Sequence, residues 1–162
     1  MKPSALNFLK IILLAGLILI DNPISSQNKF EISGGFGFPE FAALKVKYGK
    51  NIQIALSQSF WPGYKGAMIM GPTAAEIYYH FSGKSRFIEQ PTWYLLGGLG
   101  FFGGGDEKDV YFYPRLGKTF NFSKKTGINL DAGAFVPLSK GLRDFFDSSV
   151  YPSGSISFFI RL

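Results

Sequence analysis

The chain has 162 residues, enough for one domain, and its 17 Lys and Arg against 11 Asp and Glu give a formal net charge of +6. Its basic residues form no run of five or six and no stripe interleaved with aromatics, which argues against nucleic-acid binding. The absence of Cys excludes disulfide frameworks, thiolate zinc sites and cysteine nucleophiles. The 18 Phe, 8 Tyr and 20 Gly favour closely approaching strands with aromatic faces.

Residues 1–26 have the charged, apolar and polar order of a secretory signal peptide. Lys2 and Lys10 precede the unbroken apolar stretch IILLAGLILI, and a polar segment with small Ser25 and Ser26 follows. A membrane-spanning helix is the competing interpretation, but it needs about 20 apolar residues and this core has about half that number. We therefore expect cleavage just before Gln27, with 27–162 as the mature domain.

From Lys29 onward the apolar pattern has a period of two, which is typical of strands with one apolar face. Alternating segments are expected at 29–38, 42–48, 51–60, 73–82, 92–102, 110–122, 127–136 and 150–162. Pro114 falls inside the sixth segment and predicts a β-bulge there. The sequence thus predicts an all-β domain of eight strands.

The connections between these segments fall into two sets. Short turns at 49–51, 83–90 and 123–126 lie on the side of the termini. The far side has the short turn at Pro39 and three longer connections, at 61–72, 103–109 and 137–149. Short turns on one side and long loops on the other are typical of a membrane β-barrel.

The residue types on the two faces of the strands distinguish a membrane barrel from a soluble one. The polar face is rich in Gly and Ser, and such small residues fit the crowded lumen of eight strands. The apolar face is bulky and predicts two aromatic belts, comprising Phe36, Phe38, Phe60, Trp61, Phe101 and Phe112 at one end and Phe30, Tyr48, Trp93, Phe120 and Phe122 at the other. A secreted soluble β-sandwich or β-barrel is the alternative.

After the signal segment, the chain resembles the family of small eight-stranded outer-membrane β-barrels. The most specific element is the ending, where Gly154, Ile156, Phe158, Ile160 and Leu162 alternate with other residues as in the pattern that the barrel assembly machinery recognises. Leu162 stands where family members usually have Phe. The resemblance implies an antiparallel up-and-down transmembrane β-barrel in the outer membrane, with outer-membrane lipid and the assembly machinery as partners.

This topology points a set of polar side chains into the lumen, namely Glu31, Lys45, Lys47, Gln53, Glu76, Tyr78, His80, Arg115, Asn129, Asp131 and Arg161. A charge in a narrow interior must be paired to be tolerated. We therefore expect a network that plugs the barrel, with Glu31 bound to Lys45 or Lys47, and Glu76 or Asp131 bound to Arg115. An ion-conducting pore is the alternative.

One sequence feature suggests catalysis. His80 and Ser82 resemble the His-x-Ser pair of outer-membrane lipid A deacylases, with Glu89 as a candidate acidic partner. Two residues apart on a strand, they are expected to share a face, so the base would reach the nucleophile. Gly83 stands where that family has Asn, and the pair lies at the periplasmic end, whereas lipid A lies in the opposite leaflet. A lone His with scattered carboxylates makes a poor metal site, so no metal or cofactor is expected.

Two surface features also bear on function. Apolar loop residues predict either packing on strand extensions or a contact surface, and they are Trp61, Tyr64, Met68, Met70, Phe145 and Phe146. The charges divide along the axis. Basic residues lie toward the periplasmic end, at Lys29, Lys45, Lys47, Lys50, Lys84, Arg86, Lys118, Lys124, Lys125 and Arg161. Acidic residues lie toward the outside, at Glu40, Asp106, Glu107, Asp109, Asp144 and Asp147.

Ordinary charged turns would give the same asymmetry, but a basic rim also suits peptidoglycan, lipid phosphate or an envelope protein as a partner. The leading hypothesis is a non-enzymatic outer-membrane barrel with a structural or surface-interaction role. The alternatives are a lipid A-modifying hydrolase using Ser82 and His80, and a soluble secreted ligand-binding β-barrel.

Overall fold

The computed structural model describes residues 29–62, 68–103, 108–146 and 149–162. The signal peptide expected at 1–26 lies outside these residues. Within them, no helix is long and apolar enough to span a membrane.

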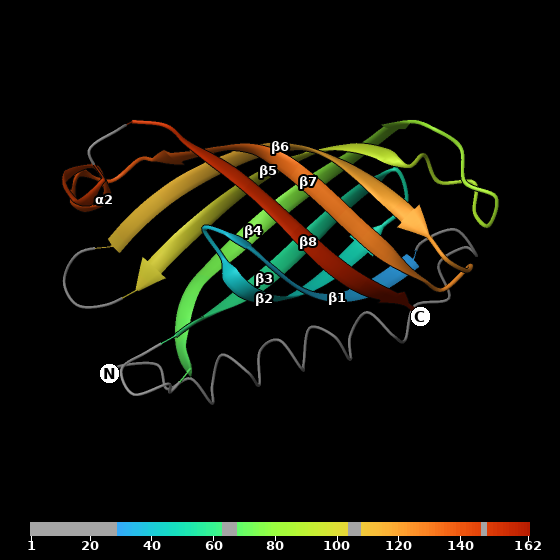
Figure 1. Ribbon diagram of the computed structural model, residues 1–162, viewed down its shortest axis with the longest axis horizontal. Helices are drawn as coiled ribbons and strands as arrows, with labels where there is room; N and C mark the ends of the chain where they lie inside the picture. Colours follow the sequence, from blue (N-terminus) through green and yellow to red (C-terminus); the bar gives the residue numbers. More distant parts are fainter. Residues whose placement is uncertain (1–28, 63–67, 104–107, 147–148) are drawn as a thin grey trace.

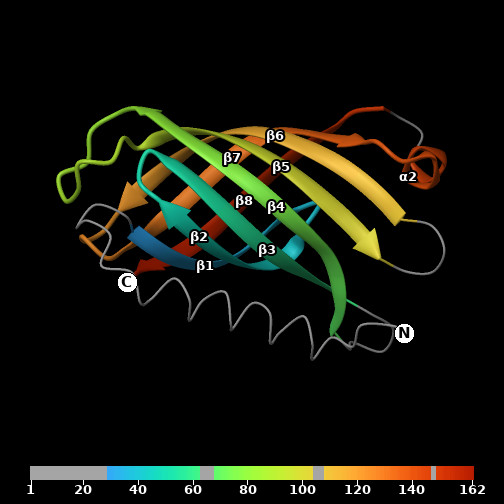
Figure 2. The same cartoon turned by 180° about the vertical axis from the view of Figure 1, so that it is seen from behind.

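Eight antiparallel strands close into a barrel in which each strand pairs with its neighbours in sequence and β1 pairs with β8 (Figures 1 and 2). The strands are β1 (Lys29–Phe38), β2 (Phe41–Gly49), β3 (Ile52–Pro62), β4 (Met68–Ser82), β5 (Trp93–Gly103), β6 (Lys108–Asn121), β7 (Thr126–Pro137) and β8 (Tyr151–Arg161). The predicted eight-stranded antiparallel up-and-down β-barrel is confirmed.

The two faces of each strand follow the alternation in the sequence. In β1, Glu31 and Ser33 are buried inside the barrel, while Ile32 and Phe36 are exposed outside. The same division runs through the other strands, because successive side chains of a strand point to opposite faces. Even β5, which is apolar on both faces, has Tyr94 buried and Leu95 exposed, as its sequence register predicts.

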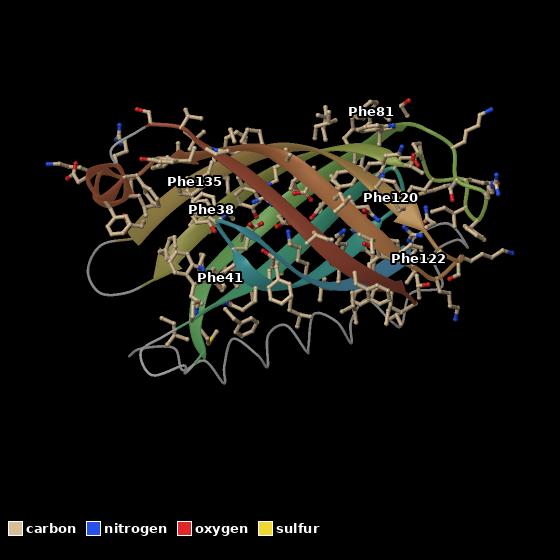
Figure 3. All side chains as sticks on the ribbon, viewed as in Figure 1. Phe38, Phe41, Phe81, Phe120, Phe122 and Phe135 are labelled. Carbon is tan, nitrogen blue, oxygen red and sulfur yellow. The ribbon has the colours of Figure 1, made fainter. Side chains whose placement is uncertain are left out.

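The two ends of the barrel differ in their connections. We call the end with the β2–β3, β4–β5 and β6–β7 connections the turn end, and the opposite end the loop end. The loop end holds a short helix, α2 (Lys140–Phe145), which the sequence pattern does not predict (Figure 1). Figure 3 shows aromatic residues at both ends, with Phe81, Phe120 and Phe122 at the turn end and Phe38 and Phe41 at the loop end.

The predicted loop at 61–72 is wrong over most of its length. β3 continues to Pro62 and β4 begins at Met68, so the hairpin extends past Phe60 through the pairs Phe60–Met70 and Trp61–Ile69. Pro62 and Gly71, which favour a loop, lie within this extension, beyond a register shift between Gln58 and Phe60.

The bulge predicted at Pro114 is also wrong. Tyr111–Pro137 and Arg115–Gly133 pair in one constant register across β6 and β7, and Gly97 faces Pro114 from β5. Proline has no N–H to donate, so the β6–β7 ladder is interrupted at this point without an extra residue. Register shifts occur instead beside Phe41, after Gln58 and after His80.

Glycine and tyrosine fill the lumen together. Gly98 and Gly100 of β5 face Tyr113 and Tyr111 of β6. A Cβ atom at Gly98 would lie 2.2 Å from Cζ of Tyr113, and one at Gly100 would lie 2.0 Å from Cζ of Tyr111. The rings therefore lie directly over the glycines, which explains why both residue types are abundant in this chain.

Candidate functional site: an ion-paired lumen

The lumen is filled by two polar networks and one aromatic cluster. At the turn end, Glu31 of β1 accepts hydrogen bonds from its neighbours on both sides. Nζ of Lys47 donates to Oε1 of Glu31 at 2.8 Å, and Nε of Arg161 donates to Oε2 at 3.1 Å. Arg161 also donates from Nη1 to Oδ1 of Asn121 at 2.6 Å. This turn-end network joins β1, β2, β6 and β8 across the lumen.

The central network is built around Arg115 of β6. Its guanidinium makes two hydrogen bonds to Glu40, from Nη1 to Oε1 at 2.9 Å and from Nη2 to Oε2 at 2.7 Å. Nη1 also donates to Asp131 at 3.1 Å, and Nε donates to Ser153 at 2.7 Å. A two-pronged guanidinium–carboxylate pair fixes orientation as well as distance, so Arg115 is held rigidly.

A third carboxylate, Glu76 of β4, completes the central network. Nζ of Lys45 donates to its Oε1 at 2.9 Å, and the hydroxyl of Tyr113 donates to the same oxygen at 2.7 Å. The hydroxyl of Tyr78 donates to Oε2. Lys45 also lies 3.5 Å from Glu40, which connects the Glu76 and Arg115 halves of the network.

An aromatic cluster, the loop-end plug, closes the lumen above these charges. Its members are Phe102, Tyr111, Phe135, Phe146 and Tyr151, whose rings contact one another with centroids 4.9 to 6.3 Å apart. Leu142 of α2 is buried against the cluster. The helix and the rings therefore cover the mouth of the barrel at this end.

Among the side chains that the structure describes, the charges inside the barrel balance. Four carboxylates, Glu31, Glu40, Glu76 and Asp131, face four cations, Lys45, Lys47, Arg115 and Arg161, and each of these groups has an opposite charge within 3.5 Å. Side chains also fill the space, since Tyr111, Tyr113, Phe135 and Phe159 are fully buried. Ion pairs and packed aromatic rings therefore occupy the described interior.

The predicted lumen residues are all found inside, and each of the two predicted pairs forms in one of its alternatives. Glu31 binds Lys47, and Asp131 binds Arg115, as expected. Glu76 binds Lys45 rather than Arg115. The other carboxylate that binds Arg115 is Glu40. From the sequence, Glu40 is grouped with the acidic residues toward the outer end of the barrel axis.

The structure places Glu40 in the β1–β2 turn at the loop end, in agreement with its position along the axis, but directs the side chain into the barrel. Its side chain is 1% exposed and lies inside the lumen. Glu40 occupies the β1–β2 turn, where Phe41 has a φ of +61° and the register of β2 shifts, so simple alternation does not apply. One signal in the sequence points to this position of Glu40. Without Glu40, the cations expected in the lumen outnumber the carboxylates expected there.

The structure does not bring together the three catalytic candidates. The ring of His80 is bound on both sides, with Nδ1 2.9 Å from the carbonyl oxygen of Pro91 and Nε2 3.1 Å from Oε1 of Gln53. The register shift between His80 and Ser82 leaves the first buried and the second exposed, so the expected shared face does not form. Glu89 is 91% exposed and lies 3.6 Å from Lys50.

The positions of the acidic and imidazole side chains also bear on metal binding. Among the residues that the structure describes, no three His, Asp or Glu side chains are grouped as a metal site requires.

The predicted loop contacts have separate surroundings. Trp61 packs edge-on against Phe102 at 5.1 Å, and Phe146 belongs to the loop-end plug, so both are strand or plug residues rather than free loop tips. Met70 and Phe145 are exposed, at 59% and 81%. Tyr64 and the side chain of Met68 lie outside the described residues.

The basic rim is smaller than the sequence suggests. Lys45, Lys47 and Arg161 are neutralised inside the lumen. The cations exposed at the turn end are Lys84, Arg86, Lys124 and Lys125. On the acidic side, Asp109 accepts a hydrogen bond from Ser139 and Asp144 is exposed. The side chain of Lys29, and Asp106, Glu107 and Asp147, lie outside the described residues.

The residues of the predicted assembly signal lie on the outer face of β8 and just beyond it. Ile156, Phe158, Ile160 and Leu162 are 47% to 73% exposed, and Gly154 shares their face. A row of outward apolar side chains on this strand is thus present in the structure.

Comparison with known proteins found no matching family model, no matching curated protein and no matching solved structure.

Proposed function

We propose that this protein is a non-enzymatic integral β-barrel of the bacterial outer membrane, made with a cleaved signal peptide at 1–26, and that it has a structural or surface-interaction role. The observation that carries the proposal is the distribution of polarity. The strands turn apolar side chains outward, and the paired charges lie inside, which is the reverse of a barrel that faces water.

The apolar surface is continuous around the barrel. Its exposed members include Ile32, Phe36, Leu44, Ile54, Leu56, Ile77, Leu95, Leu99, Phe112, Leu116, Leu130, Ile156, Phe158 and Ile160. Soluble monomers rarely expose apolar patches larger than a few hundred Å². A surrounding lipid phase accounts for this surface, and water does not.

The strand lengths suit the same environment. The shortest strand, β2, has 9 residues, and the longest, β4, has 15. A tilted strand needs about 9–11 residues to cross the hydrocarbon core of a bilayer. Each strand of this barrel is therefore long enough to span it.

The lumen supports a structural role over the two alternatives. A ligand-binding barrel needs an open apolar interior, whereas this interior is filled with paired charges and rings. A hydrolase using Ser82 needs a base beside it, and His80 is engaged with Gln53 and Pro91.

The partners proposed for this function are outer-membrane lipid and, during biogenesis, the barrel assembly machinery reading β8. The cations at the turn end make peptidoglycan or an envelope protein a further candidate partner in the periplasm.

Fractionation and gel mobility test the proposal. The chain is expressed in a double-membraned bacterium, and outer-membrane, periplasmic and soluble fractions are run unboiled and boiled on a denaturing gel. We expect the band in the outer-membrane fraction, migrating differently before and after boiling, because a closed barrel resists detergent until heated. A variant lacking 150–162 cannot pair β8 with β1 and should lose the shift. Recovery in the soluble periplasm without a shift would contradict the proposal.

A further inference from the structure

One charged side chain lies on the largely apolar outer face. Lys118 of β6 is the only charged residue at an outward-facing strand position whose side chain the structure describes. A charge on the lipid-facing surface is unfavourable unless it lies near the bilayer interface and has a partner there. Lys118 therefore needs an explanation that the fold alone does not provide.

Lys118 lies close to the turn end, among aromatic residues. It pairs across the sheet with Trp93, the first residue of β5, and its Nζ lies 5.0 Å from the centroid of that ring. The same Nζ lies 5.3 Å from the centroid of the Phe120 ring, two residues further along β6. Phe120 belongs to the aromatic group that Figure 3 shows at this end. A tryptophan near the end of a lipid-facing strand marks the interface between the hydrocarbon and the headgroups.

The ammonium of Lys118 has no carboxylate partner among the described residues. The connections on either side add positive charge. Lys84 and Arg86 are exposed in the segment before Trp93, and Lys124 and Lys125 are exposed in the turn after Phe122. The one carboxylate exposed in these connections, Glu89, lies beside Lys50. This side of the turn end therefore attracts anions.

A hollow in the apolar surface begins just above Lys118. Leu116, the outward neighbour of Lys118 on β6, lines it together with Leu95, Gly97, Pro114 and Ala132. A Cβ atom at Gly97 would have only the ring of Phe112 within reach, at 3.8 Å, so the surface there is open. The hollow is lined mainly by apolar residues, as a site for an acyl chain requires.

We propose that Lys118 and Trp93 form a binding site for an anionic phospholipid in the leaflet at the turn end. The phosphate contacts the ammonium of Lys118, the headgroup lies near the cations of the turns, and one acyl chain lies in the hollow beside Gly97. A net-negative headgroup is favoured over a zwitterionic one, because the cationic part of the latter neutralises the phosphate that the ammonium of Lys118 contacts. This inference rests on the proposed membrane location.

Quenching of Trp93 by brominated lipid tests the site. The chain contains two Trp, so Trp61→Phe leaves Trp93 as the only reporter. The membrane-purified protein is placed in phosphatidylcholine vesicles with a minor fraction of brominated phosphatidylglycerol or of brominated phosphatidylcholine. We expect brominated phosphatidylglycerol to bind about fivefold more tightly, the effect of one lysine on an anionic lipid.

Two charge-removing variants separate the site from the general charge of the protein. Lys118→Met keeps the length of the stem but should abolish the preference for phosphatidylglycerol. Lys140→Met removes the same charge from α2 at the loop end and should leave the preference unchanged. A preference that survives in Lys118→Met would overturn the proposal and assign it to the turn cations.

The remaining outcomes are also decisive. Equal quenching by both brominated lipids would overturn the headgroup site but leave the membrane location intact. Absence of quenching by either lipid would contradict the membrane location itself. Stronger displacement of the brominated lipid by lipid A than by phosphatidylglycerol would overturn the choice of a phospholipid.

Discussion

Glu40 illustrates how much one side chain in a turn contributes to the interior. It comes from the connection between β1 and β2, yet its carboxylate meets both Arg115 and Lys45 in the centre of the lumen. Without it, four lumen cations would face three carboxylates, and Arg115 would keep only Asp131 as an ionic partner. A cation held in a low-dielectric interior with too little opposite charge is strongly destabilising.

Glu40→Gln should therefore destabilise the folded barrel by roughly 3–5 kcal/mol, the usual cost of breaking a buried ion pair. The free energy of unfolding is measured by urea titration of the vesicle-inserted protein, followed by tryptophan fluorescence. Glu89→Gln is the matched control, because its carboxylate is 91% exposed and its pair with Lys50 should contribute about 0–1 kcal/mol. Equal effects of the two substitutions would mean that the central network does not hold the barrel.

The strands are predictable from the sequence because alternation is a property of each residue in a strand. Alternation alone places Glu31 on the same face as Lys47, and Asp131 on the same face as Arg115, and both pairs form. It fails wherever the backbone departs from regular pairing. Glu40 lies in a turn beside a register shift, and Ser82 follows a register shift that no local sequence signal reveals.

The loop end is harder to predict for related reasons. α2 has six residues, too few to show a helical period, and it forms because Leu142 is buried on the loop-end plug. The extension of the β3–β4 hairpin depends on the pairing of Trp61 with Ile69 across the sheet, which neither segment reveals by itself. These features depend on tertiary contacts.

A lysine scan along the outer face of β8 should give a cost that depends on depth. Ile156 lies in the middle of the strand and Ile160 lies near the turn end, and both point outward. In a bilayer, Ile156→Lys should cost roughly 2–4 kcal/mol and Ile160→Lys about 0–1 kcal/mol. The same urea titration in vesicles measures both. Equal costs at the two positions would argue against a bilayer around β8.

At the scale of the whole molecule, the barrel is a closed object with a neutral, filled interior. Four positive and four negative groups cancel inside it, and the loop-end plug with α2 covers one mouth. An eight-stranded barrel has room for its own side chains or for one small ligand, and in this barrel buried side chains such as Tyr111, Tyr113 and Phe135 take the space. Its function is therefore expected on its surfaces and not through its centre.

Planar bilayer recording provides the corresponding prediction. The purified protein should insert without producing a steady ion conductance, since an ion crossing the lumen would have to separate Arg115 from Glu40 and displace the ring of Phe135. Two controls exclude failed insertion as the reason for a lack of conductance. The protein is added at about tenfold the amount needed for a known porin, and its insertion is checked by flotation of the vesicles on a density gradient. Stable conductance steps would show that the network opens, and would restore the pore hypothesis.

The bond between Arg161 and Glu31 joins residues 130 positions apart in the sequence. It lies on the seam between β1 and β8, the strand of the barrel that is synthesised first and the one that is synthesised last. Until β8 arrives, the backbone groups of β1 that face it have no strand to pair with, and an unpaired edge is a template for aggregation. Closure of the seam removes both free edges in one event, so the proposed route to the outer membrane requires that both edges be shielded until the eighth strand is available.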